Sequence, residues 1–120
     1  MTTTDRTFDV EALRHGIEDR AADILLDLYD EDAEVWLVDR TSPPGNPHVL
    51  HGKQEIAAFL NDVCARDMSH NVERVVVQGD TAAYMESCRY ADGTRVLAST
   101  VLDLAGGRIR RQVAVQAWDE

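Results

Sequence analysis

Three short turn signals divide the last part of the chain into segments of nearly equal length. They are Gly79-Asp80, Asp92-Gly93 and Gly106-Gly107, and each separates stretches rich in β-branched residues. Dipeptides of this kind are typical of two-residue hairpin loops, because glycine readily adopts the positive φ that such loops require. The pattern therefore predicts a meander of four antiparallel strands at residues 71–77, 81–90, 94–104 and 108–118.

The first half of the chain is mainly helical in its pattern. Apolar residues follow helical spacing over residues 8–17, and Asp9 is suited to cap the N-terminus of this helix. A second helical stretch covers residues 21–29 and ends in acidic residues. The clearest amphipathic helix covers residues 53–66, with Ile56, Phe59, Leu60 and Val63 on its buried face.

Two short strands and a loop complete the pattern. The strands are predicted at residues 34–39 and 49–51, and the loop at residues 41–47 holds all three prolines of the chain. The whole pattern predicts an α+β fold, with helices covering one face of a largely antiparallel sheet. Residues 1–7 are expected to be a flexible lead, and residues 8–120 a single domain.

Composition limits the partners and the location of the protein. The 120 residues carry 22 acidic against 12 basic side chains, a net charge of −10, so a nucleic acid is not an expected partner. No apolar run approaches the ~20 residues that span a bilayer, and no signal peptide is evident, so no membrane association is expected. Two isolated cysteines, Cys64 and Cys88, fit free thiols in a reducing cytoplasm.

Counting from the three turns gives a register for the meander. It places Glu73 opposite Glu86, Glu86 opposite Ser99 and Ser99 opposite Ala114. One face of the sheet is then mixed and polar, and the other is almost wholly apolar. The polar face carries Asn71, Glu73, Val75, Tyr84, Glu86, Cys88, Leu97, Ser99, Val101, Gln112, Ala114, Gln116 and Trp118. The apolar face carries Val72, Val76, Ala83, Met85, Val96, Ala98, Thr100, Leu102, Ile109, Val113 and Val115.

The two faces allow two interpretations. In one, the polar face is solvated and its glutamates are ordinary surface charges. In the other, the polar face lines a cavity under the helices and a second subunit covers the apolar face. A bulge of one residue would exchange the faces along part of a strand.

Four stretches resemble the nuclear transport factor 2-like superfamily, in particular its SnoaL-like branch. They are LYDEDAEV at residues 28–35, VLHGKQEI at residues 49–56, QGDTA at residues 78–82 and GGRI at residues 106–109. The resemblance extends over residues 8–118. It implies a cystatin-like cone, in which a strongly curved sheet wraps around the helices and leaves a deep pocket. It also implies a homodimer formed through the outer sheet face.

The resemblance also assigns positions in the pocket. Gln112, Ala114 and Gln116 fall on the pocket side, which favours the second interpretation. Ser99 falls where ketosteroid isomerases carry the protonated aspartic acid of their oxyanion hole. Leu37 falls at their catalytic base and Leu13 near their oxyanion tyrosine. Because all three chemical groups are replaced, steroid isomerisation by that mechanism is not expected.

Four residues are candidates for acid–base chemistry. Asp39 shares a strand face with Leu37 and lies beside the proline loop, where shielding from water would raise its pKa. Glu73 opposite Glu86 would be a pair of like charges, in which one carboxyl keeps its proton. His70 falls on the apolar face unless a bulge turns it inward. Each also has a structural interpretation, as a capping, surface or core residue.

The remaining site residues are candidates for binding. Tyr84, Gln112, Gln116 and Trp118 offer amides for oxygen atoms and rings for a flat apolar body. His48 and His51 have no third ligand at a fitting spacing, so the spacing indicates no metal site. No cofactor is expected either.

These features favour a small-molecule enzyme that works by acid–base catalysis without a cofactor. Isomerisation, cyclisation or dehydration of an apolar, oxygenated compound is the expected class of reaction. Two alternatives stay open: a non-catalytic ligand-binding or dimerisation module, and an enzyme similar to the epoxide hydrolases.

Overall fold

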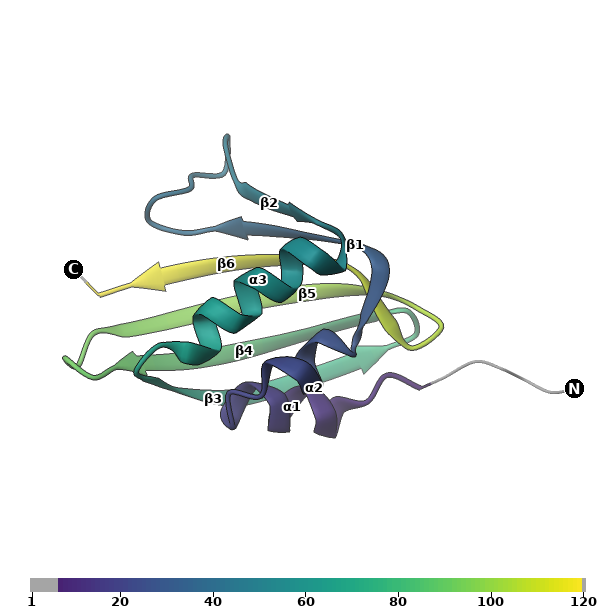
Figure 1. The fold of residues 1–120 in the computed structure, drawn as a ribbon, viewed down its shortest axis with the longest axis horizontal. Helices are drawn as coiled ribbons and strands as arrows, with labels where there is room; N and C mark the ends of the chain where they lie inside the picture. Colours follow the sequence, from purple (N-terminus) through teal and green to yellow (C-terminus); the bar gives the residue numbers. More distant parts are fainter. Residues whose placement is uncertain (1–6, 120) are drawn as a thin grey trace, which may run out of the picture.

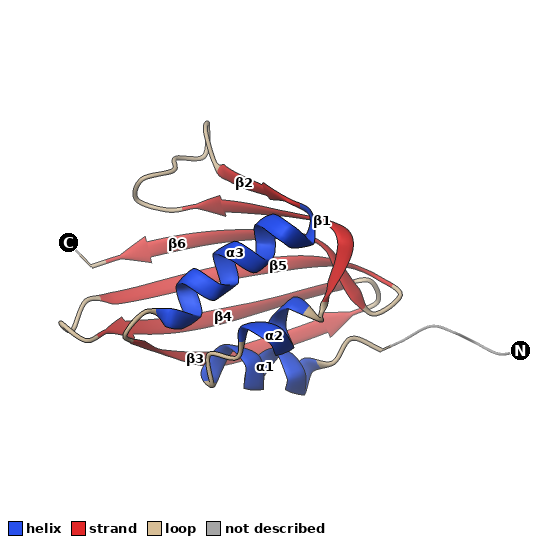
Figure 2. Cartoon of the chain, viewed as in Figure 1, coloured by secondary structure: helices blue, strands red, loops and turns tan. Residues whose placement is uncertain are grey.

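The structure is a computed structural model that describes residues 7–119. Its elements follow one another as shown in Figures 1 and 2. The helices are α1 (Val10–Glu18), α2 (Ala22–Leu26) and α3 (Gly52–Ala65). The strands are β1 (Tyr29–Val38), β2 (His48–His51), β3 (Met68–Gln78), β4 (Thr81–Tyr90), β5 (Arg95–Ala105) and β6 (Arg108–Trp118).

The six strands form one curved mixed sheet in the order β2-β1-β6-β5-β4-β3. β1 runs parallel to β6, and every other neighbouring pair is antiparallel. The three helices lie on one face of the sheet, with α3 crossing the strands and α1 beside β3 (Figure 1). This arrangement confirms the predicted α+β fold with its four-strand meander. Of the predicted lead, all but Thr7 lies outside the described residues.

The helices begin where the sequence predicts, but the second one is shorter. The carboxylate of Asp9 caps α1 by accepting a hydrogen bond from the Ala12 amide at 3.0 Å. The helix predicted over residues 21–29 stops at Leu26. Tyr29 already pairs with Ile109 of β6, so the acidic residues that follow it belong to β1. Tertiary strand pairing thus prevails over local helical spacing at this point.

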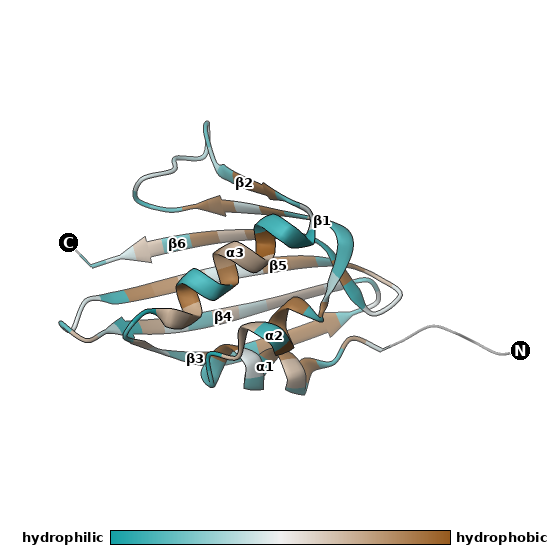
Figure 3. Cartoon of the chain, in the orientation of Figure 1, coloured by the Kyte–Doolittle hydropathy of each residue, from teal (hydrophilic) through white to brown (hydrophobic). Residues whose placement is uncertain are grey.

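The core lies between the helices and the concave face of the sheet. Its most deeply buried large side chains are Ile56 of α3, Val35 of β1, Leu102 of β5 and Ile109 of β6. Apolar and polar residues alternate along α3 in Figure 3, as expected for a helix with one buried side. The apolar side of α3 therefore holds the helix against the sheet. Ile109, predicted on the outer face, belongs to this core.

The strand pairing differs from the predicted register by one residue at three places. Glu73 is an extra residue between Val72 and Arg74, so Val72 rather than Glu73 lies opposite Glu86. The β4–β5 connection is longer than two residues, and Glu86 pairs with Ala98. Arg110 is a second extra residue, in β6, and Ser99 pairs with Val115. The three predicted pairs are therefore wrong, because bulges and a longer turn cannot be counted from turn residues alone.

These shifts decide which side chains face inward. β4 keeps the predicted parity, and β6 keeps it beyond the bulge at Arg110, with Tyr84 and Gln112 buried. β5 has the opposite parity, so Ala98 and Thr100 are buried and Ser99 is exposed. In β3 the bulge turns the residues that precede it, so Met68, His70 and Val72 face inward and Asn71 and Glu73 outward. Val75, beyond the bulge, faces inward as predicted.

The outer face of the sheet carries large apolar side chains in contact with solvent. They are Val76, Leu97, Val101 and Val115, which are 44–63% exposed. The predicted outer face included Val76 and Val115, whereas Leu97 and Val101 come to it through the altered parity of β5. Dimerisation through this face stays a prediction.

Within residues 7–119, every helix is too short or too polar to cross a membrane.

Candidate functional site

A cavity of about 300 Å³ lies between the helices and the concave face of the sheet. This volume is at the lower end of the range for small-molecule sites. Two larger hollows, of about 460 and 610 Å³, are more open features of the surface. The enclosed cavity is the candidate site because it alone of these three contains a cluster of mutually bonded titratable side chains.

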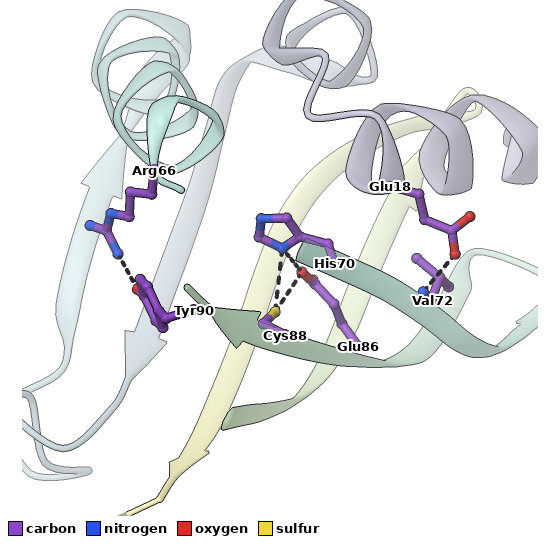
Figure 4. A network of polar contacts seen from close by, with 7 residues as sticks. All are labelled: Glu18, Arg66, His70, Val72, Glu86, Cys88 and Tyr90. Atoms are coloured by element: carbon purple, nitrogen blue, oxygen red, sulfur yellow. Dashed lines mark hydrogen bonds and ion pairs between the residues drawn. The ribbon is translucent and has the colours of Figure 1, made fainter. Parts of the chain in front are cut away.

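Three side chains that line the cavity form this cluster. Figure 4 shows how they meet. Nδ1 of His70 lies 2.7 Å from Oε2 of Glu86 and 3.3 Å from Sγ of Cys88. The Cys88 thiol donates to the same Oε2 atom at 3.1 Å. The side chains of His70 and Glu86 are only 6% and 16% exposed. The cluster is thus a closed triangle of one nitrogen, one oxygen and one sulfur atom.

Two neighbouring strands position the triangle. His70 of β3 lies directly opposite Cys88 of β4, and Glu86 is two residues before Cys88 on the same face. His70 reaches this face only because the extra residue Glu73 shifts the register of β3. His70 and Glu86 were predicted separately as acid–base candidates, and Cys88 was predicted on the polar face without a role. Only the bulge brings all three together.

Burial and the charge of Glu86 together keep the proton on the Cys88 thiol. Burial, followed by the repulsion of the Glu86 carboxylate, raises the pKa of the Cys88 thiol well above its usual range. Cys88 therefore stays a thiol and a hydrogen-bond donor at neutral pH. Glu86, as an ionised acceptor, places the proton of a neutral His70 ring on Nδ1 and leaves Nε2 as its basic nitrogen.

Two buried phenols stand near the cluster. The Tyr29 hydroxyl donates a hydrogen bond to Oε1 of Gln112 at 2.5 Å. The side chains of Tyr84 and Thr100 are hydrogen-bonded to each other. Burial is the largest cause that raises the pKa of both phenols far above 10, and the charge of Glu86 adds to it. Both tyrosines therefore remain protonated donors. Tyr29 and Thr100 were missed by sequence reasoning, because one was assigned to a helix and the other to the outer face.

The mouth of the cavity is aromatic and charged. The rings of Tyr90 and Trp118 stack with centroids 5.6 Å apart, and the Arg40 guanidinium lies 4.1 Å above the Trp118 ring. Arg66 donates to the Tyr90 hydroxyl at 2.9 Å and pairs with Asp62 at 2.6 Å. A flat ligand entering here would meet two aromatic rings and the Arg66 guanidinium.

Asp39 also lies on the cavity side, but its carboxylate holds the loop. Oδ1 accepts hydrogen bonds from the amide of Thr41 at 2.9 Å and from its hydroxyl at 3.0 Å. Partial burial acts to raise the pKa of Asp39, but hydrogen bonds from Thr41 and Ser42 outweigh it, and the pKa lies below its usual value. This direction is opposite to that expected for a shielded base.

The remaining predicted site residues divide into two groups. Leu13, Leu37, Tyr84, Gln112, Gln116 and Trp118 all line the cavity. The Trp118 indole donates to Oε1 of Gln116 at 3.0 Å, which holds both side chains at the mouth. Glu73 and Ser99 are exposed and do not line it. The predicted glutamate pair is therefore absent, and Glu86 has His70 as its partner instead.

Comparison with known proteins gives the family. The family model that describes the SnoaL-like domain matches residues 10–112 of the sequence, which is most of the chain. This protein belongs to the SnoaL-like family. The predicted resemblance is thereby confirmed. A search of curated proteins with the sequence finds no significant match.

Solved structures share the fold of this SnoaL-like protein. An NTF2-like protein of unknown function from Mesorhizobium loti superposes with a TM-score of 0.77 at 18% identity, covering 89% of this chain and 86% of that one. A protein from Kribbella flavida, provisionally assigned as a ketosteroid isomerase, superposes with a TM-score of 0.74 at 20% identity. The match covers 92% of this chain and 74% of that one. A provisionally assigned isomerase from Bacillus subtilis superposes with a TM-score of 0.67 at 21% identity. The match covers 89% of this chain and 84% of that one. At such identities the likeness shows the fold alone.

Proposed function

We propose that this SnoaL-like protein is an acid–base enzyme for a small molecule, with the His70–Glu86 pair as its proton-transfer group. The observation that carries the proposal is the 2.7 Å contact between Nδ1 of His70 and Oε2 of Glu86 inside the cavity. A buried carboxylate that bonds one imidazole nitrogen orients the ring and stabilises its protonated form. This arrangement makes Nε2 of His70 the base, in place of Asp39.

The cavity wall supports an apolar, oxygenated substrate. Leu13, Leu37 and Ala114 supply apolar surface, while the amides of Gln112 and Gln116 supply donors and acceptors. The buried Tyr84 phenol adds a hydroxyl that keeps its proton, and Tyr29, which donates to Oε1 of Gln112, leaves the amide N–H groups of Gln112 as donors for a ligand. Such donors stabilise negative charge on a carbonyl oxygen when a neighbouring C–H bond is broken.

The proposed reaction is proton transfer next to a carbonyl group. Nε2 of His70 takes a proton from the carbon beside the carbonyl, and the electron pair of that C–H bond moves to form an enolate. The enolate oxygen accepts hydrogen bonds from the polar wall. Return of the proton to a different carbon completes an isomerisation. Alternatively, the enolate carbon attacks a second carbonyl, and the oxygen of that carbonyl takes the proton back from His70, which completes a cyclisation.

Deuterium exchange tests this proposal without knowledge of the natural substrate. Apolar ketones and diketones are incubated with the protein in heavy water, and loss of the α-proton signal is followed by NMR. His70→Gln should lower the exchange rate by roughly 10²–10⁴ for any compound that the wild type exchanges. Glu73→Gln is the matched control, because Glu73 is exposed on the bulge beside the site.

Two outcomes would contradict the proposal. Exchange that is unchanged by His70→Gln would remove the base. Binding in the cavity is detected by shifts in the NMR signal of Trp118. Compounds that bind in this way but never exchange their α-protons would favour a non-catalytic binding module.

A further inference from the structure

We propose that His70, Glu86 and Cys88 also form a binding site for a divalent transition-metal ion of the zinc type. The three potential ligand atoms, Nδ1, Oε2 and Sγ, lie within 4.8 Å of one another. Each is already in hydrogen-bonding contact with the other two, at 2.7, 3.1 and 3.3 Å. They point at a common centre, as Figure 4 shows.

The size of the triangle fits one face of a tetrahedral site. Zinc–ligand bonds of about 2.0–2.3 Å place neighbouring tetrahedral ligand atoms roughly 3.3–3.7 Å apart. The observed triangle has to open by roughly half an ångström to admit the ion. The pairing of β3 with β4 fixes the backbone positions, so this opening would have to come from rotation of the Glu86 and Cys88 side chains.

The donor set selects the kind of metal. One imidazole, one thiolate and one carboxylate suit zinc, cobalt and similar ions, whereas magnesium and calcium require oxygen ligands. Three protein ligands also leave a fourth position, which faces the cavity because all three residues line it. Open sites of three ligands are characteristic of zinc that exchanges water or small ligands.

The charges around the cavity favour a cation. Among the described residues, the charged side chains that line it are Asp39, Asp62 and Glu86 against Arg66, and Arg66 is paired with Asp62. The chain as a whole carries −10. When the ion binds, the Cys88 thiol releases its proton to solvent, so Cys88 and Glu86 then carry two negative charges that balance a divalent ion.

The metal and the proposed substrate chemistry use the same atoms. A bound ion would take the Nδ1 and Oε2 atoms of the His70–Glu86 pair. The proton of the neutral ring would then lie on Nε2, so Nε2 could no longer accept a proton from the substrate. Inhibition by zinc is a consequence that rests on the proposed function. Binding of the ion does not rest on it, and metal titration requires no substrate.

Cobalt(II) titration of the full chain, freed of metal with a chelator, tests the site. We expect one ion per chain and a thiolate-to-cobalt charge-transfer band in the near ultraviolet. Zinc should displace the cobalt and raise the midpoint of thermal unfolding. Calorimetry with zinc measures the affinity.

Matched variants assign the ligands. Cys88→Ser should abolish the charge-transfer band, and His70→Gln should weaken binding at least ten-fold. Cys64→Ser is the control, because Cys64 lines the same cavity but lies outside the triangle. It should leave the band and the affinity unchanged.

Three results would overturn the site. The first is a wild-type protein that binds cobalt without a charge-transfer band. The second is a band that disappears in Cys64→Ser. The third is that folded Cys88→Ser and His70→Gln variants keep the full affinity for the metal. The first is read from the wild type alone, so it holds even where a variant fails to fold.

Discussion

Raising the pH above about 10 should destabilise the protein, because two tyrosine side chains are buried without charge in the cavity. Burial is the main cause that raises the pKa of Tyr29 and of Tyr84 far above 10. The folded state therefore keeps two phenol protons that the unfolded chain loses, in addition to the thiol proton of Cys88, whose pKa is also raised. The contribution of these phenols to stability is complete below the unfolded pKa, and it declines as the pH rises from that value toward the folded pKa.

The size of this effect follows from the number of protons. At about pH 11, one unit above the pKa of a free tyrosine, each buried phenol lowers the free energy of unfolding by about 1.4 kcal/mol. The two together remove about 2.8 kcal/mol. The free energy of unfolding of a native domain is roughly 5–15 kcal/mol, so this loss is a substantial part of the total stability.

Urea unfolding between pH 8 and pH 11, followed by circular dichroism, measures the effect. Tyr29→Phe and Tyr84→Phe should each remove about half of the difference attributed to the phenols. The comparison concerns the change with pH and not the stability at pH 8, because Tyr29→Phe also leaves Oε1 of Gln112 without its donor, at a cost of about 1–3 kcal/mol. Tyr29→Phe and Tyr84→Phe proteins that lose stability with pH as steeply as the wild type would refute the reasoning. Tyrosinate absorbance near pH 10 in the folded protein would refute it too, if it exceeded what the third tyrosine of the chain, Tyr90, can give alone.

Two further changes test the packing and the outer face. Gly16→Ala should destabilise the protein by about 1–2 kcal/mol, since the added Cβ would lie 2.7 Å from Cδ2 of Leu25. Gly45→Ala meets no atom within 4 Å and should change the unfolding midpoint little, and equal effects of the two would contradict this. Val101→Asp with Val115→Asp should convert the proposed homodimer to a monomer in sedimentation, because both side chains are about half exposed on the outer face. A wild type that is already monomeric at micromolar concentration would remove the dimer.

The fold could be predicted largely from turns and periodicity. The glycine turns gave the correct strands because residues such as Gly79 and Gly106 do adopt positive φ. The end of the second helix was missed, since the pairing of Tyr29 with Ile109 depends on a strand 80 residues later in the chain. Long-range pairing of this kind leaves no local signal.

The site could be predicted only in part, because parity depends on every residue between a turn and a side chain. The longer β4–β5 turn reversed β5 and brought Thr100 inward in place of Ser99. The bulge at Arg110 restored the expected parity, so Gln112 and Gln116 were placed correctly by two errors that cancel. No signal in the composition of either strand distinguishes these cases.

The extra residue Glu73 has a consequence for how new chemistry can arise in this fold. Deleting it would bring Ser69 and Asn71 to the cavity and send His70 to the outer surface, without replacing any of these side chains. A single insertion or deletion can therefore exchange the whole set of groups that one strand presents. In any relative that lacks this extra residue, the position equivalent to His70 can be found only by placing a gap inside β3.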